Sequence, residues 1–121
     1  YNNNGRIARV INEGDLFLEM TRYPDLCGGF EHVVETYREK AIFFLDEIVE
    51  STESFGSAID KSRIGFLIDS YLGVKDSRII NWRTDSLSRG GSRKMVSSNP
   101  YSEVYSEDWC ISLNHPIFLG V

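Results

Sequence analysis

In the middle of the chain, apolar residues recur among polar ones with the spacing of amphipathic helices. From residue 30 onward, apolar side chains return every three or four positions, as the burial of one helical face requires. The members of this stripe up to residue 41 are Phe30, Val33, Val34, Tyr37 and Ala41. The stripe continues over residues 44–49. The pattern therefore predicts either one helix of about twenty residues or two shorter helices that separate near Lys40.

A second helical pattern occupies residues 57–72 and begins with the sequence Ser-x-x-Asp. In such a capping box the Ser57 hydroxyl accepts from the Asp60 backbone N–H, while the carboxylate reaches back to the helix start. An unbroken apolar stripe follows, and Gly73 is suited to end the helix in a left-handed conformation. Gly65 lies inside the helix, where glycine costs ~1 kcal/mol relative to alanine, so we expect another backbone to approach it closely.

The N-terminal part of the chain predicts a strand, a turn and a short helix. Residues 5–15 show brief alternation of apolar and polar side chains and end in Gly14 and Asp15, which is typical of a short strand and a turn. Asp15 is a suitable N-cap for a helix over residues 16–23. Pro24 ends that helix, because the residue before a proline is pushed out of the α region.

The C-terminal part predicts one more helix and then mostly loop. Residues 76–87 have a helical pattern with Asp76 or Ser77 as the cap. Residues 86–106 are rich in serine and glycine and predict a loop with one short strand at the sequence Lys-Met-Val. Residues 108–114 alternate apolar and small polar side chains, which predicts a half-buried strand.

These elements predict an α+β fold that is mainly helical. We expect about four helices and a small antiparallel sheet formed by the N-terminal and C-terminal strands. With 121 residues, 41% of them hydrophobic and 26% charged, the chain is suited to form one domain with a buried core. No apolar run approaches the length of a membrane span. The two distant cysteines, Cys27 and Cys110, predict reduced thiols in a cytoplasmic protein, the alternative being one disulfide between them.

The charge of the chain is unevenly distributed. Residues 61–94 carry eight basic and three acidic side chains, a net charge of +5, whereas the remainder carries five basic and fifteen acidic ones, a net charge of −10. Such asymmetry predicts a two-faced surface that could orient an acidic partner or a nucleic acid. Alternatively, the two parts pack together and neutralise each other.

The sequence Tyr-Pro-Asp-Leu-Cys-Gly-Gly, at residues 23–29, raises the possibility of a catalytic cysteine. Cys27 precedes a helix start, the kind of position that reactive cysteines occupy, and His32 is close in sequence. No further residue completes a set of nucleophile, base and orienting group. We therefore interpret Cys27 as a core residue in a tight turn, with Gly28 or Gly29 in a conformation that other residues resist.

Other candidate sites are weak. Glu31, His32 and Glu35 lie on the polar side of their helix, which favours a solvated face over a metal site. The loop at residues 88–94 lacks the spacing of a phosphate-binding loop, although its basic side chains could contact phosphates. Trp82, between basic neighbours, could stack on a base or a protein partner, or could belong to the core. No cofactor and no metal is expected, and the chain is predicted not to be an enzyme.

The order and spacing of these turns and helices resemble the C-terminal domain of the AbiEi family. Members of this family are antitoxins of type IV toxin–antitoxin and abortive-infection systems, and are transcriptional regulators. The family has a short helix ending in proline, a Cys/Ala-Gly-Gly turn, and a later helix with an Arg-Leu-Gly-aromatic-Leu core. The matching positions here are Pro24, Cys27, Gly28, Gly29, Gly56, Arg63, Gly65, Phe66 and Leu67, with a final strand over residues 109–114. The resemblance covers roughly residues 8–114 and departs at Ile64 and at the start of the first helix.

The resemblance implies a domain organisation and a role. It makes residues 1–121 the C-terminal antitoxin domain of a longer chain, whose N-terminal winged-helix domain binds operator DNA and represses its own operon, and which takes part in phage defence. The domain would counteract a nucleotidyltransferase-type toxin, with or without direct contact. It also favours a helix break near residues 40–43. The alternative function is an auxiliary nucleic-acid-binding module that uses residues 61–94.

Both functions would use the basic segment as a binding face. The residues expected to form it are Arg63, Arg78, Trp82, Arg83, Arg89, Arg93 and Lys94. For Arg63 we also consider a structural ion pair with Glu35 or Asp60. The structural motif of the domain would be Pro24, Cys27, Gly28, Gly29 and Gly65.

Overall fold

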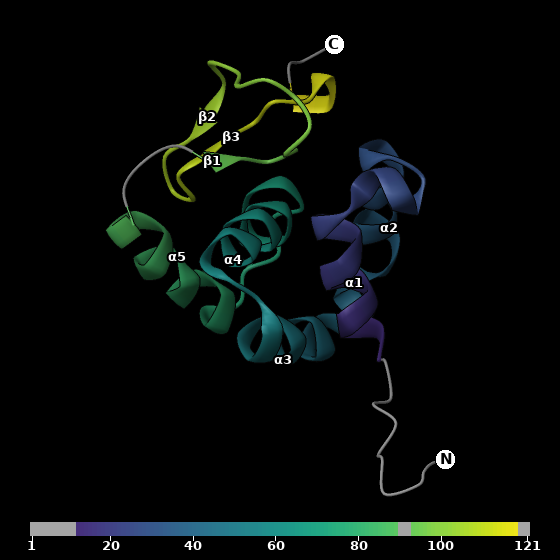
Figure 1. Ribbon diagram of the computed structural model, residues 1–121. Helices are drawn as coiled ribbons and strands as arrows, with labels where there is room; N and C mark the ends of the chain where they lie inside the picture. The colour runs from purple at the N-terminus through teal and green to yellow at the C-terminus, as the bar shows by residue number, and fades with distance from the viewer. Residues whose placement is uncertain (1–11, 90–92, 119–121) are drawn as a thin grey trace, which may run out of the picture.

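The computed structural model describes residues 12–89 and 93–118 and shows helices packed beside a small sheet (Figure 1). The α-helices are α1 (Glu13–Arg22), α2 (Phe30–Lys40), α3 (Leu45–Phe55), α4 (Ala58–Gly65) and α5 (Ser77–Arg89). Shorter helical segments are η1 (Pro24–Cys27), η2 (Ala41–Phe44), η3 (Phe66–Tyr71) and η4 (Pro116–Phe118), and the strands are β1 (Arg93–Lys94), β2 (Tyr105–Ser106) and β3 (Ile111–Ser112). The predicted α+β class, mainly helical with a small sheet, is confirmed.

The sheet is mixed, with β3 in the centre. β1 pairs with β3 in parallel, Arg93 opposite Ile111, and β2 pairs with β3 antiparallel. The prediction of a purely antiparallel sheet is therefore wrong in this detail, because β1 reaches β3 by a long connection that brings it in parallel. The predicted N-terminal strand falls largely on residues 1–11, outside the described residues. The last strand is shorter than predicted, and its polar Ser112 is as buried as Ile111.

Capping interactions fix where α1 and α4 begin. Asn12, not Asp15, is the N-cap of α1: Asn12 Oδ1 accepts from the Asp15 backbone N–H (2.9 Å), and the Asp15 carboxylate accepts from the Asn12 N–H (3.2 Å). Asp15 thus closes a capping box from the third helical position. The capping box of α4 is confirmed, since Asp60 Oδ2 accepts from the Ser57 N–H (2.8 Å).

In the helical regions the structure decides one alternative that periodicity leaves open and corrects one prediction. The stripe that begins at Phe30 forms two helices, α2 and α3, separated by the 3₁₀ segment η2, as the resemblance favours. The long helix over residues 57–72 is α-helical only to Gly65, and η3 continues it with the wider π-helical turn. Gly73 has φ of +73° and ends it in the predicted left-handed conformation.

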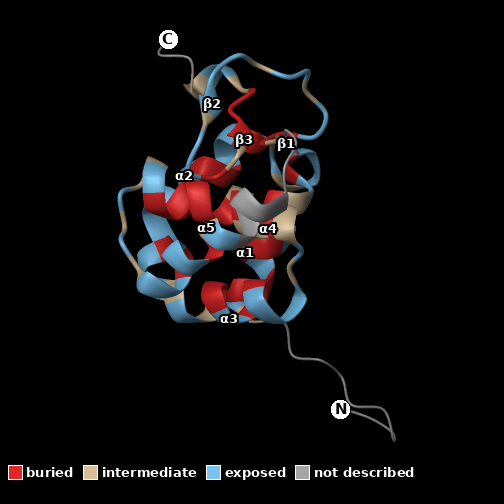
Figure 2. Cartoon of the chain, turned by 90° about the vertical axis from the view of Figure 1, so that its left-hand side faces the viewer, coloured by how far each residue is buried: buried red, intermediate tan, exposed pale blue. Residues whose placement is uncertain are grey.

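The core lies where the helices face one another and where the sheet covers α4 (Figure 2). Its largest fully buried side chains include Trp109, Tyr37 and Phe17. The Tyr37 hydroxyl donates to the Phe17 carbonyl (3.1 Å) and lies 2.7 Å from Thr21 Oγ1. Burial raises the pKa of Tyr37. In the described part of the chain, no helix combines the length and apolar character that crossing a membrane requires.

Candidate partner-binding surface

The turn between α1 and α2 has a structural explanation. Residues Pro24–Cys27 form the 3₁₀ segment η1, and Gly28 and Gly29 follow with φ of +90° and +95°. These angles favour glycine, so the two glycines let the chain reverse into α2. Cys27 packs against the core and is not in a disulfide. Within residues 12–89 and 93–118, no group of three His, Cys, Asp or Glu side chains could hold a metal ion.

Six of the eight basic side chains of residues 61–94 form two sets with different surroundings. The first set, Lys75, Arg78 and Arg83, is neutralised by carboxylates. Arg78 Nη2 lies 2.8 Å from Asp46 and 2.9 Å from Asp76. Hydrogen bonds from Arg78 lower the pKa of Asp76 and raise that of Arg78 itself. A side chain held in this way is poorly available to an external anion.

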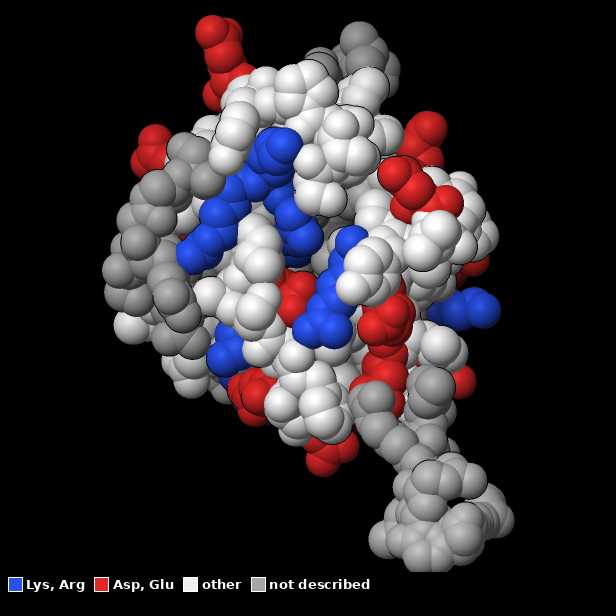
Figure 3. Space-filling view, viewed as in Figure 1, with Lys and Arg blue, Asp and Glu red and all other residues white. Residues whose placement is uncertain are grey.

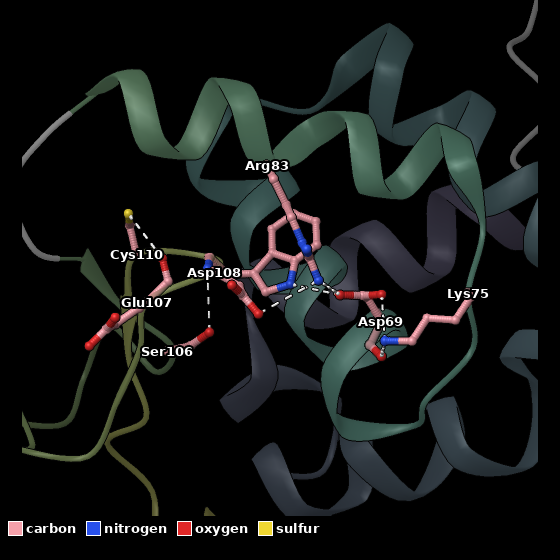
Figure 4. A network of polar contacts seen from close by, with 8 residues as sticks. Asp69, Lys75, Arg83, Ser106, Glu107, Asp108 and Cys110 are labelled. Atoms are coloured by element: carbon pink, nitrogen blue, oxygen red, sulfur yellow. Dashed lines mark hydrogen bonds and ion pairs between the residues drawn. The ribbon is translucent and has the colours of Figure 1, made fainter.

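Two members of the first set, Lys75 and Arg83, form ion pairs with one carboxylate, that of Asp69 (Figure 4). Its carboxylate is fully buried on η3 and lies 2.6 Å from Arg83 Nη2 and 3.0 Å from Lys75 Nζ. The indole N–H of Trp109 also donates to it (3.3 Å), and the Arg83 guanidinium lies 5.7 Å from the Trp109 ring centroid. Burial opposes ionisation of Asp69, but the hydrogen bonds from Arg83, Lys75 and Trp109 outweigh burial and lower its pKa. The group joins η3, α5 and the residues before β3.

Trp82 belongs to the core, so the prediction that it contacts a partner is wrong. Its side chain is 3% exposed, and its indole N–H donates to Glu53 Oε2 (3.1 Å). Burying an indole while satisfying its N–H is a structural arrangement that leaves no face free for stacking. Arg89 ends α5, and its side chain lies outside the described residues.

The second set, Arg63, Arg93 and Lys94, forms what we call the basic corner. Figure 3 shows Lys and Arg side chains gathered between the sheet and α4. Arg63 Nε donates to the Lys94 carbonyl (2.9 Å), and Arg93 Nη1 donates to Ser62 Oγ (3.2 Å). These two bonds fasten β1 to α4.

No described acidic side chain forms an ion pair with any residue of the basic corner. Burial lowers the pKa of Arg63, partly offset by the charge of Asp60. The predicted pairing of Arg63 with Asp60 or Glu35 is wrong, because Asp60 binds Arg22 (3.0 Å) and Glu35 binds Arg38 (3.0 Å). The described residues therefore leave the three cations of the basic corner without a carboxylate counterion.

Two features of this surface were not predicted from the sequence. Tyr101 is 60% exposed, and Lys94 Nζ lies 5.3 Å from the centroid of its ring. Asp69, the counterion that neutralises Arg83 and Lys75, comes from the middle of an apolar helix. A signal for Asp69 was present, because a carboxylate beside the buried Ile68 requires a cationic partner.

Comparison with known protein families finds no family model that matches the chain. Searches of characterised proteins and of solved structures likewise find no match. The resemblance to the AbiEi family stays a prediction that rests on the quoted residues.

Proposed function

We propose that this chain is a non-catalytic regulatory domain of the antitoxin type, which counteracts a nucleotidyltransferase-type toxin in the cytoplasm. The basic corner is its working surface and binds an anionic partner. The observation that supports this is the contrast between the two basic sets. Lys75, Arg78 and Arg83 are held by carboxylates, whereas Arg63, Arg93 and Lys94 have no carboxylate partner among the described residues.

The resemblance supplies the wider setting of this proposal. A winged-helix domain preceding these residues would bind operator DNA and repress the operon, in a system of phage defence. The domain present in this chain would carry the antitoxic activity. The turn at Pro24–Gly29 fits the structural role that the resemblance implies, because its cysteine is a core contact and its glycines provide the reversal.

A growth experiment tests the role of the basic corner. The chain is co-expressed with the toxin encoded beside it, as wild type and as the double variant Arg93→Glu and Lys94→Glu. We expect the wild type to restore growth and the double variant to lose this ability while its circular dichroism spectrum is retained. Growth restored by the double variant would show that the basic corner is not the working surface.

The double variant Arg38→Glu and Lys40→Glu is the matched control. It makes the same change of charge on two exposed side chains of α2. If both double variants lose rescue equally, net charge and not the basic corner is responsible.

An alternative function is supported by the position of Tyr101. An exposed aromatic ring beside a lysine is a suitable platform for a nucleotide base, with the phosphates contacted by Arg93 and Lys94. The domain would then be an auxiliary nucleic-acid-binding module. Binding to a fluorescent oligonucleotide would weaken steeply with salt, because each phosphate contact releases counterions. Binding that is independent of salt would contradict this alternative.

A further inference from the structure

Arg63 has different surroundings from most other arginines of the described chain. Four of these arginines form an ion pair with at least one carboxylate, namely Arg22, Arg38, Arg78 and Arg83. Arg63 forms none with any residue that the structure describes, although its side chain is partly buried. An arginine that is withdrawn from water without a counterion is an exception that calls for a reason.

The burial of Arg63 is only partly compensated inside the protein. Burial lowers the pKa of Arg63, and the negative charge of Asp60 opposes this effect without cancelling it. The Asp60 carboxylate is itself bound by Arg22, through Nε at 3.1 Å and Nη2 at 3.0 Å. A charged group that the fold leaves uncompensated is typical of sites that bind a ligand of opposite charge.

The guanidinium group of Arg63 is held at one nitrogen and has unused donors at the other two. Its Nε donates to the Lys94 carbonyl (2.9 Å), which holds the group against β1. Among the described residues, neither Nη1 nor Nη2 of Arg63 donates to an acceptor. The planar N–H₂ groups of an arginine form a fork that fits two oxygens of one carboxylate or phosphate.

Two more cations come from β1, next to Arg63. Arg93 Nη1 donates to Ser62 Oγ (3.2 Å), and Ser62 directly precedes Arg63 on α4. Lys94 Nζ lies 5.3 Å from the ring centroid of the exposed Tyr101. The Lys and Arg side chains of this region are seen together between the sheet and α4 in Figure 3. The junction of α4 and β1 therefore carries three positive charges with no described carboxylate to balance them.

We infer that this junction binds a phosphate monoester and that Arg63 is the residue that recognises it. The inference rests on the proposed function, because it specifies the anionic partner of the basic corner. Nη1 and Nη2 of Arg63 would donate to two phosphate oxygens, while Arg93 and Lys94 supply the remaining positive charge. A phosphate monoester carries about two negative charges at neutral pH, so it balances three cations better than a single carboxylate does. The terminal phosphate of a nucleic-acid strand and the phosphate of a free nucleotide share this chemistry.

Nuclear magnetic resonance titration of the ¹⁵N-labelled chain with inorganic phosphate, at constant ionic strength, tests the inference. We expect the Arg63 Nε–H signal and the backbone amide signals of Arg93 and Lys94 to shift in a saturable way. Arg63→Lys keeps the charge but loses the fork, so it should bind phosphate roughly tenfold more weakly or worse. The matched control is Arg38→Lys, at an exposed position of α2, which should bind as the wild type does.

The amide signal of Met95 reports whether Arg63→Lys keeps β1 in place, because the Met95 N–H donates to the Ser112 carbonyl (2.9 Å). If this variant loses β1, the Arg63 Nε–H signal of the wild type decides, since a phosphate site at Arg63 requires a saturable shift there. Shifts that do not saturate would overturn the inference. So would equal affinity of a variant Arg63→Lys that keeps β1.

Further titrations identify the kind of anion. A blocked Asp-Glu peptide that binds more tightly than phosphate would overturn the inference in favour of an acidic protein partner. Tighter binding of adenosine monophosphate than of a 5′-phosphorylated oligothymidylate would indicate a free nucleotide, and the reverse would indicate a strand end.

The inference and the proposed function fail separately. Loss of rescue in the variant Arg93→Glu and Lys94→Glu, combined with no phosphate binding by the wild type, would refute the phosphate site alone. Phosphate binding by the wild type, combined with rescue by that variant, would refute the proposed function alone.

Discussion

The indole ring of Trp109 packs directly onto the backbone of Gly65, and occupies the space where a Cβ atom would be. Both residues are fully enclosed, so the ring has no free direction in which to move. The contact joins the end of α4 to the residue that precedes β3 by two positions. Sequence reasoning predicted a close approach at Gly65, but of another backbone; the structure shows a side chain instead.

We expect Gly65→Ala to destabilise the fold. Alanine would gain ~1 kcal/mol from its helix propensity, but its methyl group would collide with the Trp109 ring, and overpacking a closed core typically costs 1–3 kcal/mol or more. The steric effect therefore exceeds the propensity effect, and urea unfolding should show a net loss of stability. Ser70→Ala, at an exposed position of η3, should change the stability by less than about 0.5 kcal/mol. A stabilised Gly65→Ala variant would contradict the packing described.

Local patterns in the sequence identified most of the helices, because their signals are contained within one element. The spacing from Phe30 onward and the capping box at Ser57 specify α2, α3 and α4. Periodicity did not decide whether the chain breaks after Lys40, because η2 keeps the apolar stripe in phase. The strands have only two residues each, which is too short for alternation to specify their partners or direction.

The division of the basic segment could not be predicted, because it depends on tertiary ion pairs. Arg78 meets Asp46 from 32 positions earlier in the chain, and Arg83 meets Asp69 from 14 positions earlier. Trp82 is different, since a signal for its burial existed. It follows Ile79 by three positions, which places both on one face of α5, and both are buried. Its charged neighbours suggested a binding role that the helical spacing did not support.

We expect Asp69→Asn to destabilise the fold at neutral pH by about 2 kcal/mol, the usual contribution of hydrogen bonds to a charged group. Asp69 is fully buried and its pKa is lowered, so its folded pKa lies below the unfolded value of about 3.9. Its stabilising effect is therefore fully present above pH 4 to 5 and is lost as the pH falls through the folded pKa. Urea unfolding at pH 7 and pH 3 should show the difference between variant and wild type shrinking at pH 3.

Asp46→Asn is the control for this pH dependence. Asp46 also pairs with an arginine, but its side chain is 85% exposed. Exposed ion pairs contribute about 0–1 kcal/mol, so this variant should stay close to the wild type at both pH values. If Asp69→Asn were equally mild at pH 7, the buried carboxylate would not be the centre of a stabilising group.

Trp82→Ala should reduce stability strongly and leave anion binding unchanged. Truncating a buried aromatic side chain typically costs 3–5 kcal/mol, and Glu53 would also lose the indole donor. Binding to a heparin column, measured at a temperature where the variant is folded, should match the wild type. Trp82→Phe offers a milder version if the alanine variant is unfolded. A folded Trp82 variant with weakened heparin binding would contradict the assignment of this residue to the core.

Lys94 and Tyr101 should contribute to single-stranded nucleic-acid binding in measurably different ways. Lys94→Ala removes one phosphate contact, so it should reduce the slope of log K against log salt by about 0.7 for a single strand. Tyr101→Ala removes a stacking ring, which should weaken binding by about 1–3 kcal/mol while the slope is retained. Tyr101→Phe keeps the ring and should bind as the wild type does. Fluorescence anisotropy over a range of salt concentrations measures both the affinity and its salt dependence.

Two outcomes would contradict these roles. Equal slopes for all three variants and the wild type would contradict a phosphate contact by Lys94. Full affinity of Tyr101→Ala would contradict stacking.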